Sequence, residues 1–168
     1  GVKFHDGKPL NADAVAAIFE RSSNPDLSCN SWITAFSNMK VTVKVVDDLT
    51  FEVTADQPAP ILPVQLTTLT AYSPDTPKDK LVTDPIATGP YKVESFVAGE
   101  EILLKRNEDY WGEKPVVERA RYVFRSESAV RPAMVQKGEA HPAQNIQQQD
   151  ATDPAMDASY PTGNVSYL

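Results

Sequence analysis

The first fifteen residues, GVKFHDGKPLNADAV, constrain the fold more than any other stretch of the chain. Val2 to Phe4 alternate in the manner of a short strand, and the Asp6-Gly7 pair is typical of a tight turn, because glycine adopts positive φ without steric cost. Asn11 is a residue type that caps helices. Three apolar residues then recur at helical spacing and predict one buried face: Val15, Ile18 and Phe19. The chain is therefore expected to begin with an edge strand, a turn and a capped helix.

Residues 1–85 are expected to form the first of two subdomains. Behind the first helix, residues 22–31 have the composition of an exposed loop. Apolar residues alternate on either side of a turn within residues 41–53, which predicts a β-hairpin. The prolines that follow exclude a regular strand, although Pro60 can open a short helix. Pro, Asp, Lys and Thr are dense in residues 73–85, which predicts a surface connection between the subdomains.

Residues 86–168 are expected to form the second subdomain. Two alternating segments within residues 91–106 flank an Ala98-Gly99 turn pair and predict a second hairpin. Arginines alternate with apolar residues through 119–125, which predicts a third strand that buries its aromatic face. The fold class that these elements indicate is α+β, with mixed sheets built from hairpins and with flanking helices.

A helix is also predicted over residues 129–137. Ser126 or Ser128 can cap its start, and Gly138 ends it. Residues 147–168 carry only weak signals, for a short helix and for a strand at the very end.

Three blocks of the sequence occur in an order that chance does not explain. The first comprises Val2 to Gly7, Pro9, Ala12 and, less closely, Asp13 to Val15. The second is Thr88-Gly89-Pro90-Tyr91, and the third comprises Asn107, Asp109 to Gly112, Lys114 and Pro115. Together they resemble the signature of the family 5 extracellular solute-binding proteins, the peptide, nickel and oligosaccharide receptors of ABC importers. The residues that carry the resemblance are Val2, Phe4, His5, Asp6, Gly7, Thr88, Gly89, Pro90, Tyr91, Asn107, Asp109, Tyr110, Trp111 and Gly112.

This resemblance implies a function and a location. Receptors of the family have two lobes that close over a ligand by a hinge, and the closed form docks on an ABC permease in the membrane. The resemblance implies that this chain is an internal fragment covering much of the first lobe of a bacterial periplasmic or extracellular receptor. Peptides or similar small oligomeric solutes are the expected ligands. The alternative is a free-standing protein-interaction domain without a transport role.

The composition narrows the classes of partner. The formal net charge is −7 and the sequence pI is about 4.8, so nucleic acid is not an expected partner, because phosphates attract a cationic surface. Cys29 is the single cysteine, so any disulfide needs a partner outside this chain. The sequence has no run of eighteen apolar residues and predicts no membrane span. Self-association is expected through an uncovered end of the chain, near Val2 to Phe4 or Val165 to Leu168.

Neither catalysis nor metal binding is predicted. His5 and His141 are the only histidines, and no cluster of three or four metal ligands is visible in the sequence. No nucleophile elbow or phosphate-binding loop occurs, so we expect a protein that is not an enzyme and that needs no cofactor. His5 is expected to stabilise the turn beside it. Trp32 and Phe36 are the weak candidates for ligand contact, although packing in the core is the simpler role for both.

Overall fold

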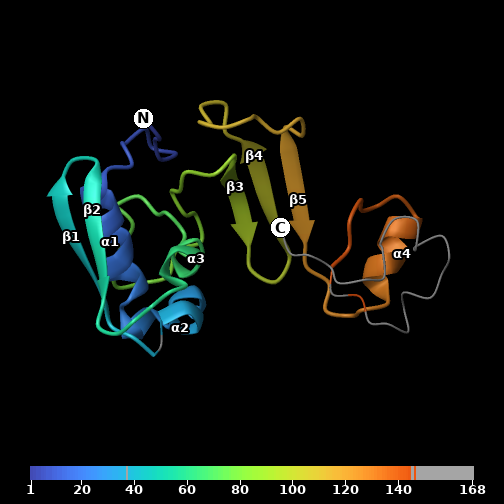
Figure 1. The fold of residues 1–168 in the computed structure, drawn as a ribbon. Helices are drawn as coiled ribbons and strands as arrows, with labels where there is room; N and C mark the ends of the chain where they lie inside the picture. Colours follow the sequence, from blue (N-terminus) through green and yellow to red (C-terminus); the bar gives the residue numbers. More distant parts are fainter. Residues whose placement is uncertain (37, 145, 147–168) are drawn as a thin grey trace. The chain divides into compact units, whose positions relative to one another are not determined.

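A computed structural model describes residues 1–36, 38–144 and 146, and Figure 1 shows its ribbon. The contacts divide the chain into two compact units, which are described separately. Gly1–Val97 and Ile102–Tyr122 form the first unit; Ala98–Glu101 and the described residues from Val123 onward form the second. The subdomain division predicted between residues 85 and 86 falls within the first unit and stays a prediction.

The first helix, α1, runs over Ala12–Ser22 and is capped as predicted. The Asn11 Oδ1 atom accepts a hydrogen bond from the Ala14 amide at 3.0 Å. Asp13 in the first turn and Arg21 in the last turn both complement the helix dipole. The predicted apolar face is confirmed at Ile18 and Phe19, which are buried.

The predicted edge strand at Val2 to Phe4 is wrong. Lys3 and Pro9 form only an isolated antiparallel bridge. Proline has no amide hydrogen to continue a ladder, so pairing ends after one bridge. The turn itself is confirmed, because the Phe4 amide donates to the Lys8 carbonyl at 2.8 Å and Gly7 has a φ of +87°.

Residues 22–31 are only partly a loop. A 3₁₀ turn occupies Pro25–Leu27, and a second helix, α2, covers Asn30–Phe36. A helix of seven residues is too short to show a clear period, and its stability comes from packing. The Trp32 ring lies edge-on to Phe19, with centroids 5.8 Å apart, and tilted against Phe36 at 4.7 Å.

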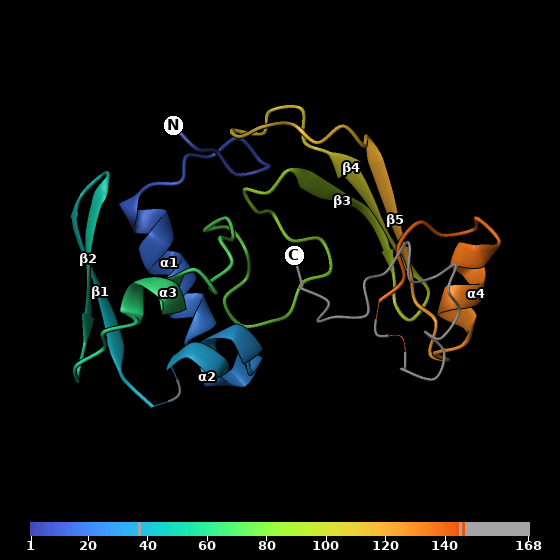
Figure 2. The same ribbon diagram turned by 45° about the vertical axis from the view of Figure 1, so that its right-hand side comes forward.

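The first hairpin is confirmed. Strand β1, Val41–Asp47, pairs antiparallel with β2, Thr50–Ala55. Val43 faces Val53 in the register, and a bulge interrupts the pairing close to the turn. One side of the hairpin packs on α1, which Figure 2 shows lying beside both strands.

A third helix, α3, covers Leu62–Leu66 and begins two residues later than Pro60 predicts. Pro63 lies in its first turn, where the missing amide hydrogen has no cost. The Gln65 side chain donates from Nε2 to the carbonyl of Ala35 at 2.7 Å and so ties α3 to α2.

The second hairpin and a third strand form one sheet in the order β3-β4-β5. Strand β3 covers Tyr91–Val97, β4 covers Glu101–Arg106 and β5 covers Arg119–Val123. The predicted turn is confirmed by the φ of +76° at Gly99. The predicted burial of the aromatic face is wrong, because the side chains of Tyr122 and Phe124 are 54% and 43% exposed. Alternation alone does not supply the second layer that covers a sheet.

In the second unit, helix α4 covers Val130–Gln136. Its N-cap residue is Ala129, where the sequence predicts Ser126 or Ser128, so the predicted position of the cap is wrong. The predicted end is confirmed, because Gly138 has a φ of +73° immediately beyond the helix. The helix and strand predicted within residues 147–168 lie outside the described residues. Within the described part of the chain, no helix has the length and apolar character needed to cross a membrane.

We predict that Gly7→Ala destabilises the protein by about 1–2 kcal/mol, because alanine, unlike glycine, has a Cβ atom that is strained at this positive φ. Gly89→Ala is the matched control: a Cβ at either glycine meets no atom within 4 Å, but Gly89 lies outside the positive-φ region. The control is expected to change the free energy of unfolding by less than about 0.5 kcal/mol. Urea denaturation measures both, and equal losses would contradict the assignment of strain to Gly7.

Candidate functional site

The three signature blocks meet at one place in the first unit, around the backbone of residues 87–90. The His5 amide donates to the carbonyl of Ala87 at 2.8 Å, and His5 Nε2 lies 3.0 Å from the carbonyl oxygen of Gly89. The Lys92 ammonium group reaches back to the His5 carbonyl at 3.2 Å. His5 therefore binds the second signature block, and its predicted role in stabilising its own turn is wrong. We call residues 2–10, 87–92 and 107–112 together the signature junction.

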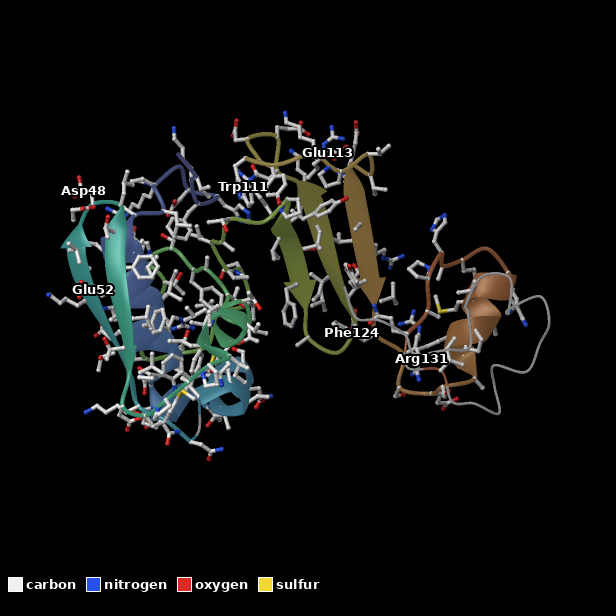
Figure 3. The ribbon with its side chains drawn as sticks, in the orientation of Figure 1. Asp48, Glu52, Trp111, Glu113, Phe124 and Arg131 are labelled. Atoms are coloured by element: carbon white, nitrogen blue, oxygen red, sulfur yellow. The ribbon has the colours of Figure 1, made fainter. Side chains whose placement is uncertain are left out.

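The third block contacts the same carbonyl groups. The buried Asn107 donates from its side chain to Gly89 O at 3.3 Å and from its backbone to Pro90 O at 2.8 Å. Trp111 lies on the loop that follows β4, and its indole Nε1 donates to Thr88 O at 3.0 Å (Figure 3). Trp111 is nevertheless 60% exposed, so this contact anchors the loop without burying the ring.

The remaining signature residues support this arrangement locally. The side chain of Asn107 accepts a bond from the Asp109 amide at 3.2 Å, which shapes the loop. The Tyr110 and Trp111 rings lie 5.2 Å apart, and a Cβ at Gly112 would come within 2.9 Å of the Tyr110 ring. In the first block, Phe4 is buried and Val2 O accepts a hydrogen bond from the Leu10 amide. In the second block, the Tyr91 hydroxyl donates to Val117 O. The signature thus has a structural basis.

Asp6 takes the role of stabilising the turn. Its Oδ1 accepts from the Lys8 amide at 3.0 Å, and its Oδ2 accepts from the hydroxyl of the buried Ser73 at 2.8 Å. Desolvation raises the pKa of Asp6, but the hydrogen bonds from Lys8 and Ser73, together with the charge of Lys8, outweigh it and lower the pKa below its ordinary value of 3.8.

Trp32 and Phe36, the two ligand candidates, lie together on α2 beside an open depression. The depression has a volume of about 590 Å³ and is also lined by Ser23, Asn38, Met39, Lys40, Val41 and Asp56. Trp32 is half-buried, whereas Phe36 is 1% exposed and contributes mainly to the core. Of the pair, Trp32 has the accessible ring surface that a ligand contact requires.

The polar wall of the depression comes from the two ends of the β1–β2 hairpin. The Lys40 amide donates to Asp56 Oδ1 at 2.9 Å, and the Asp56 amide donates to Lys40 O at 3.0 Å. The Gln57 side chain also donates to Asn38 O at 2.8 Å. Lys40 and Asp56 carry no signal in the sequence, because residues 38–41 and 56 belong to different strand ends that only the hairpin brings together.

Metal chemistry has no visible site in the described residues. Within residues 1–36, 38–144 and 146, no group of three or more His, Cys, Asp or Glu side chains is placed to bind a metal ion. Cys29 is a free, half-buried thiol whose Sγ lies 4.0 Å from the Ser31 hydroxyl.

Comparisons with known proteins point to one family. The family model for bacterial extracellular solute-binding proteins, family 5 (middle region), matches residues 1–168. A glutathione-binding protein, GsiB of Salmonella choleraesuis, is 32% identical over 146 residues, which cover 83% of this chain and 28% of that protein. The dipeptide-binding protein of Escherichia coli is 31% identical over 166 residues, with 83% of this chain and 31% of that protein covered. The chain therefore spans under a third of the length of these relatives.

Solved structures of ABC-transporter binding proteins also match this chain. The periplasmic binding protein DppA from Helicobacter pylori, in complex with the peptide STSA, matches with a TM-score of 0.71 and 25% identity, over 84% of this chain and 32% of that one. A nickel ABC transporter protein from Bacillus halodurans matches with a TM-score of 0.74 over 92% of this chain and 32% of that one; at 22% identity, it supports the fold alone.

We predict that Asp6→Asn lowers stability at neutral pH and that its deficit relative to the wild type shrinks on acidification. The lowered pKa means that the ionised carboxylate adds stability above pH 3.8, and that this stability is lost as the pH falls through the lower folded-state value. Urea denaturation from pH 7 to pH 3 measures the effect. Ser73→Ala removes one of the hydrogen bonds and should give a smaller change of the same sign. A deficit for Asp6→Asn that stays constant over this range would contradict the assignment.

Proposed function

The chain belongs to the family 5 bacterial extracellular solute-binding proteins, and from this membership we propose that it is part of a receptor that captures peptides or similar small solutes for an ABC importer. The match of the family model over residues 1–168 carries this proposal. The relatives named for binding glutathione and dipeptides support a peptide-like ligand. A receptor of this kind acts outside the cytoplasm, with the membrane permease of the importer as its partner.

Within such a receptor, this chain supplies a scaffold and one part of a ligand surface. The signature junction links the segment that leads into α1 with the start of β3, through the main-chain bond from the His5 amide to Ala87 O and through side-chain bonds from His5 and Lys92 to main-chain carbonyls. Such a frame is compatible with relatives that are named for different ligands, glutathione and dipeptides among them. Specificity then belongs to variable surfaces, and the depression at Trp32 is the candidate in this chain.

The depression offers a chemically mixed surface. The ring of Trp32 supplies apolar area, while Lys40 and Asp56 add one positive and one negative side chain to the lining. A short peptide carries apolar groups and charges of both signs, so it is chemically complementary to such a lining. The shallow wall encloses little of a ligand, and tight binding needs a second surface from the rest of the receptor.

We predict that Trp32→Ala weakens peptide binding by the full-length protein about tenfold or more, because truncation of an aromatic anchor removes its contact area. Isothermal titration calorimetry with a library of di- to pentapeptides measures the dissociation constants. Ile33→Ala is the control, since Ile33 lies on the same helix, is 48% exposed and does not line the depression.

The two outcomes that would contradict this proposal are distinct. Peptide binding that is equally strong in the wild type and in Trp32→Ala would exclude the depression as a ligand surface while leaving the receptor function intact. Failure of the wild type to bind any peptide, glutathione or nickel chelate would contradict the receptor function itself.

A further inference from the structure

Both ring nitrogens of His5 face backbone groups of residues 87–89. Nε2 lies 3.0 Å from the carbonyl oxygen of Gly89, and the amide of Ala87 donates to Nδ1 at 3.4 Å. A carbonyl oxygen can only accept and an amide can only donate, so Nε2 must carry the hydrogen and Nδ1 must be unprotonated. The observed geometry therefore requires a neutral imidazole in its Nε2–H form.

Protonation is incompatible with this arrangement. An imidazolium ring donates from both nitrogens, so its Nδ1–H would point at the Ala87 N–H, donor against donor. The main-chain bond from the His5 amide to Ala87 O, at 2.8 Å, keeps the two residues close. Histidine is the side chain that ordinarily changes its charge between about pH 5 and 8.

We propose that His5 is a pH-sensitive clasp: as a neutral ring it joins the turn segment 2–10 to residues 87–92, and a second hydrogen on the ring loosens that junction. The inference rests on the contacts of this one ring. It goes beyond the proposed function and does not depend on it.

Charged and polar groups from three elements lie around His5. From β3, the Lys92 ammonium group donates to the His5 carbonyl at 3.2 Å and so brings a positive charge to the same residue. In its own segment, the neighbouring carboxylate of Asp6 is engaged by the Lys8 amide and the Ser73 hydroxyl. Lys8 in turn pairs with Asp75. From the loop after β4, the neutral side chain of Asn107 shares the Gly89 carbonyl.

The contacts of His5 join the segment before α1 to the segment before β3. The segment 2–10 leads directly into α1, and residues 87–92 lead into β3. The bonds from His5 and Lys92 connect the two segments, while Asn107 and Trp111 hold residues 88–90 from the other side. Acidification should therefore weaken the attachment of the first segment and leave the Asn107 and Trp111 contacts in place.

Hydrogen exchange in the full-length protein tests this inference. Protection factors, corrected for intrinsic exchange rates, are compared at pH 7.5 and pH 5.5 for peptides covering residues 1–10 and 86–92. Wild-type protection in these peptides should fall on acidification, by at most about tenfold per pH unit for one linked proton. His5→Gln keeps a side-chain donor but does not titrate, so its protection should not show this fall. His141→Gln, which removes the other histidine, should respond like the wild type.

Two results would overturn the proposal. One is a loss of protection on acidification that is the same in His5→Gln and in the wild type. The other comes from imidazole nitrogen NMR shifts of the wild type at pH 7.5, which do not depend on a variant that folds: a hydrogen on Nδ1 of His5 would exclude the clasp, whereas a hydrogen on Nε2 alone supports it.

Discussion

The carbonyl groups of residues 87–90 are the point on which the rest of the first unit depends. Five donors from two distant segments converge on them: the backbone amide and ring of His5, the backbone and side-chain amides of Asn107, and the Trp111 indole. A backbone carbonyl has two lone pairs and costs free energy when buried without a partner, and these bonds satisfy the carbonyls and join the segments. Three of the five donors are the side chains of His5, Asn107 and Trp111. Pro90 has no amide hydrogen, so its carbonyl is the only main-chain group with which this residue can form a hydrogen bond.

A second, apolar organisation lies beside this polar one. Phe19 on α1 contacts Trp32 on α2, and Trp32 contacts Phe36, so one aromatic cluster holds the short helix against the long one. The side chain of Gln65 on α3 adds a hydrogen bond to the Ala35 carbonyl of α2. A seven-residue helix has little stability alone, so the position of the Trp32 ring is decided by these neighbours.

The two organisations serve different parts of the proposed receptor. The junction is made of turns and of hydrogen bonds from backbone and side-chain donors to backbone carbonyls, which suits a frame that is compatible with many ligands. The depression at Trp32 is made of side chains from a helix and two strand ends, where single substitutions alter the surface without touching the frame. The exposed ring of Tyr122 on β5 and that of Phe124 just after it offer apolar area as well.

The sequence by itself determined the features that depend on local chemistry. The Asn11 cap, the turn at Gly7, both hairpins and the helix end at Gly138 follow from residue type and spacing, and the signature blocks identified the family. Only the tertiary structure decided what these pieces contact. It placed His5 on Gly89 and not on its own turn, made a helix of residues 30–36 and brought Lys40 next to Asp56. These outcomes arise from pairing across tens of residues, for which local propensity carries no signal, and for the same reason the strand at Val2 to Phe4 and the burial of Tyr122 were predicted wrongly.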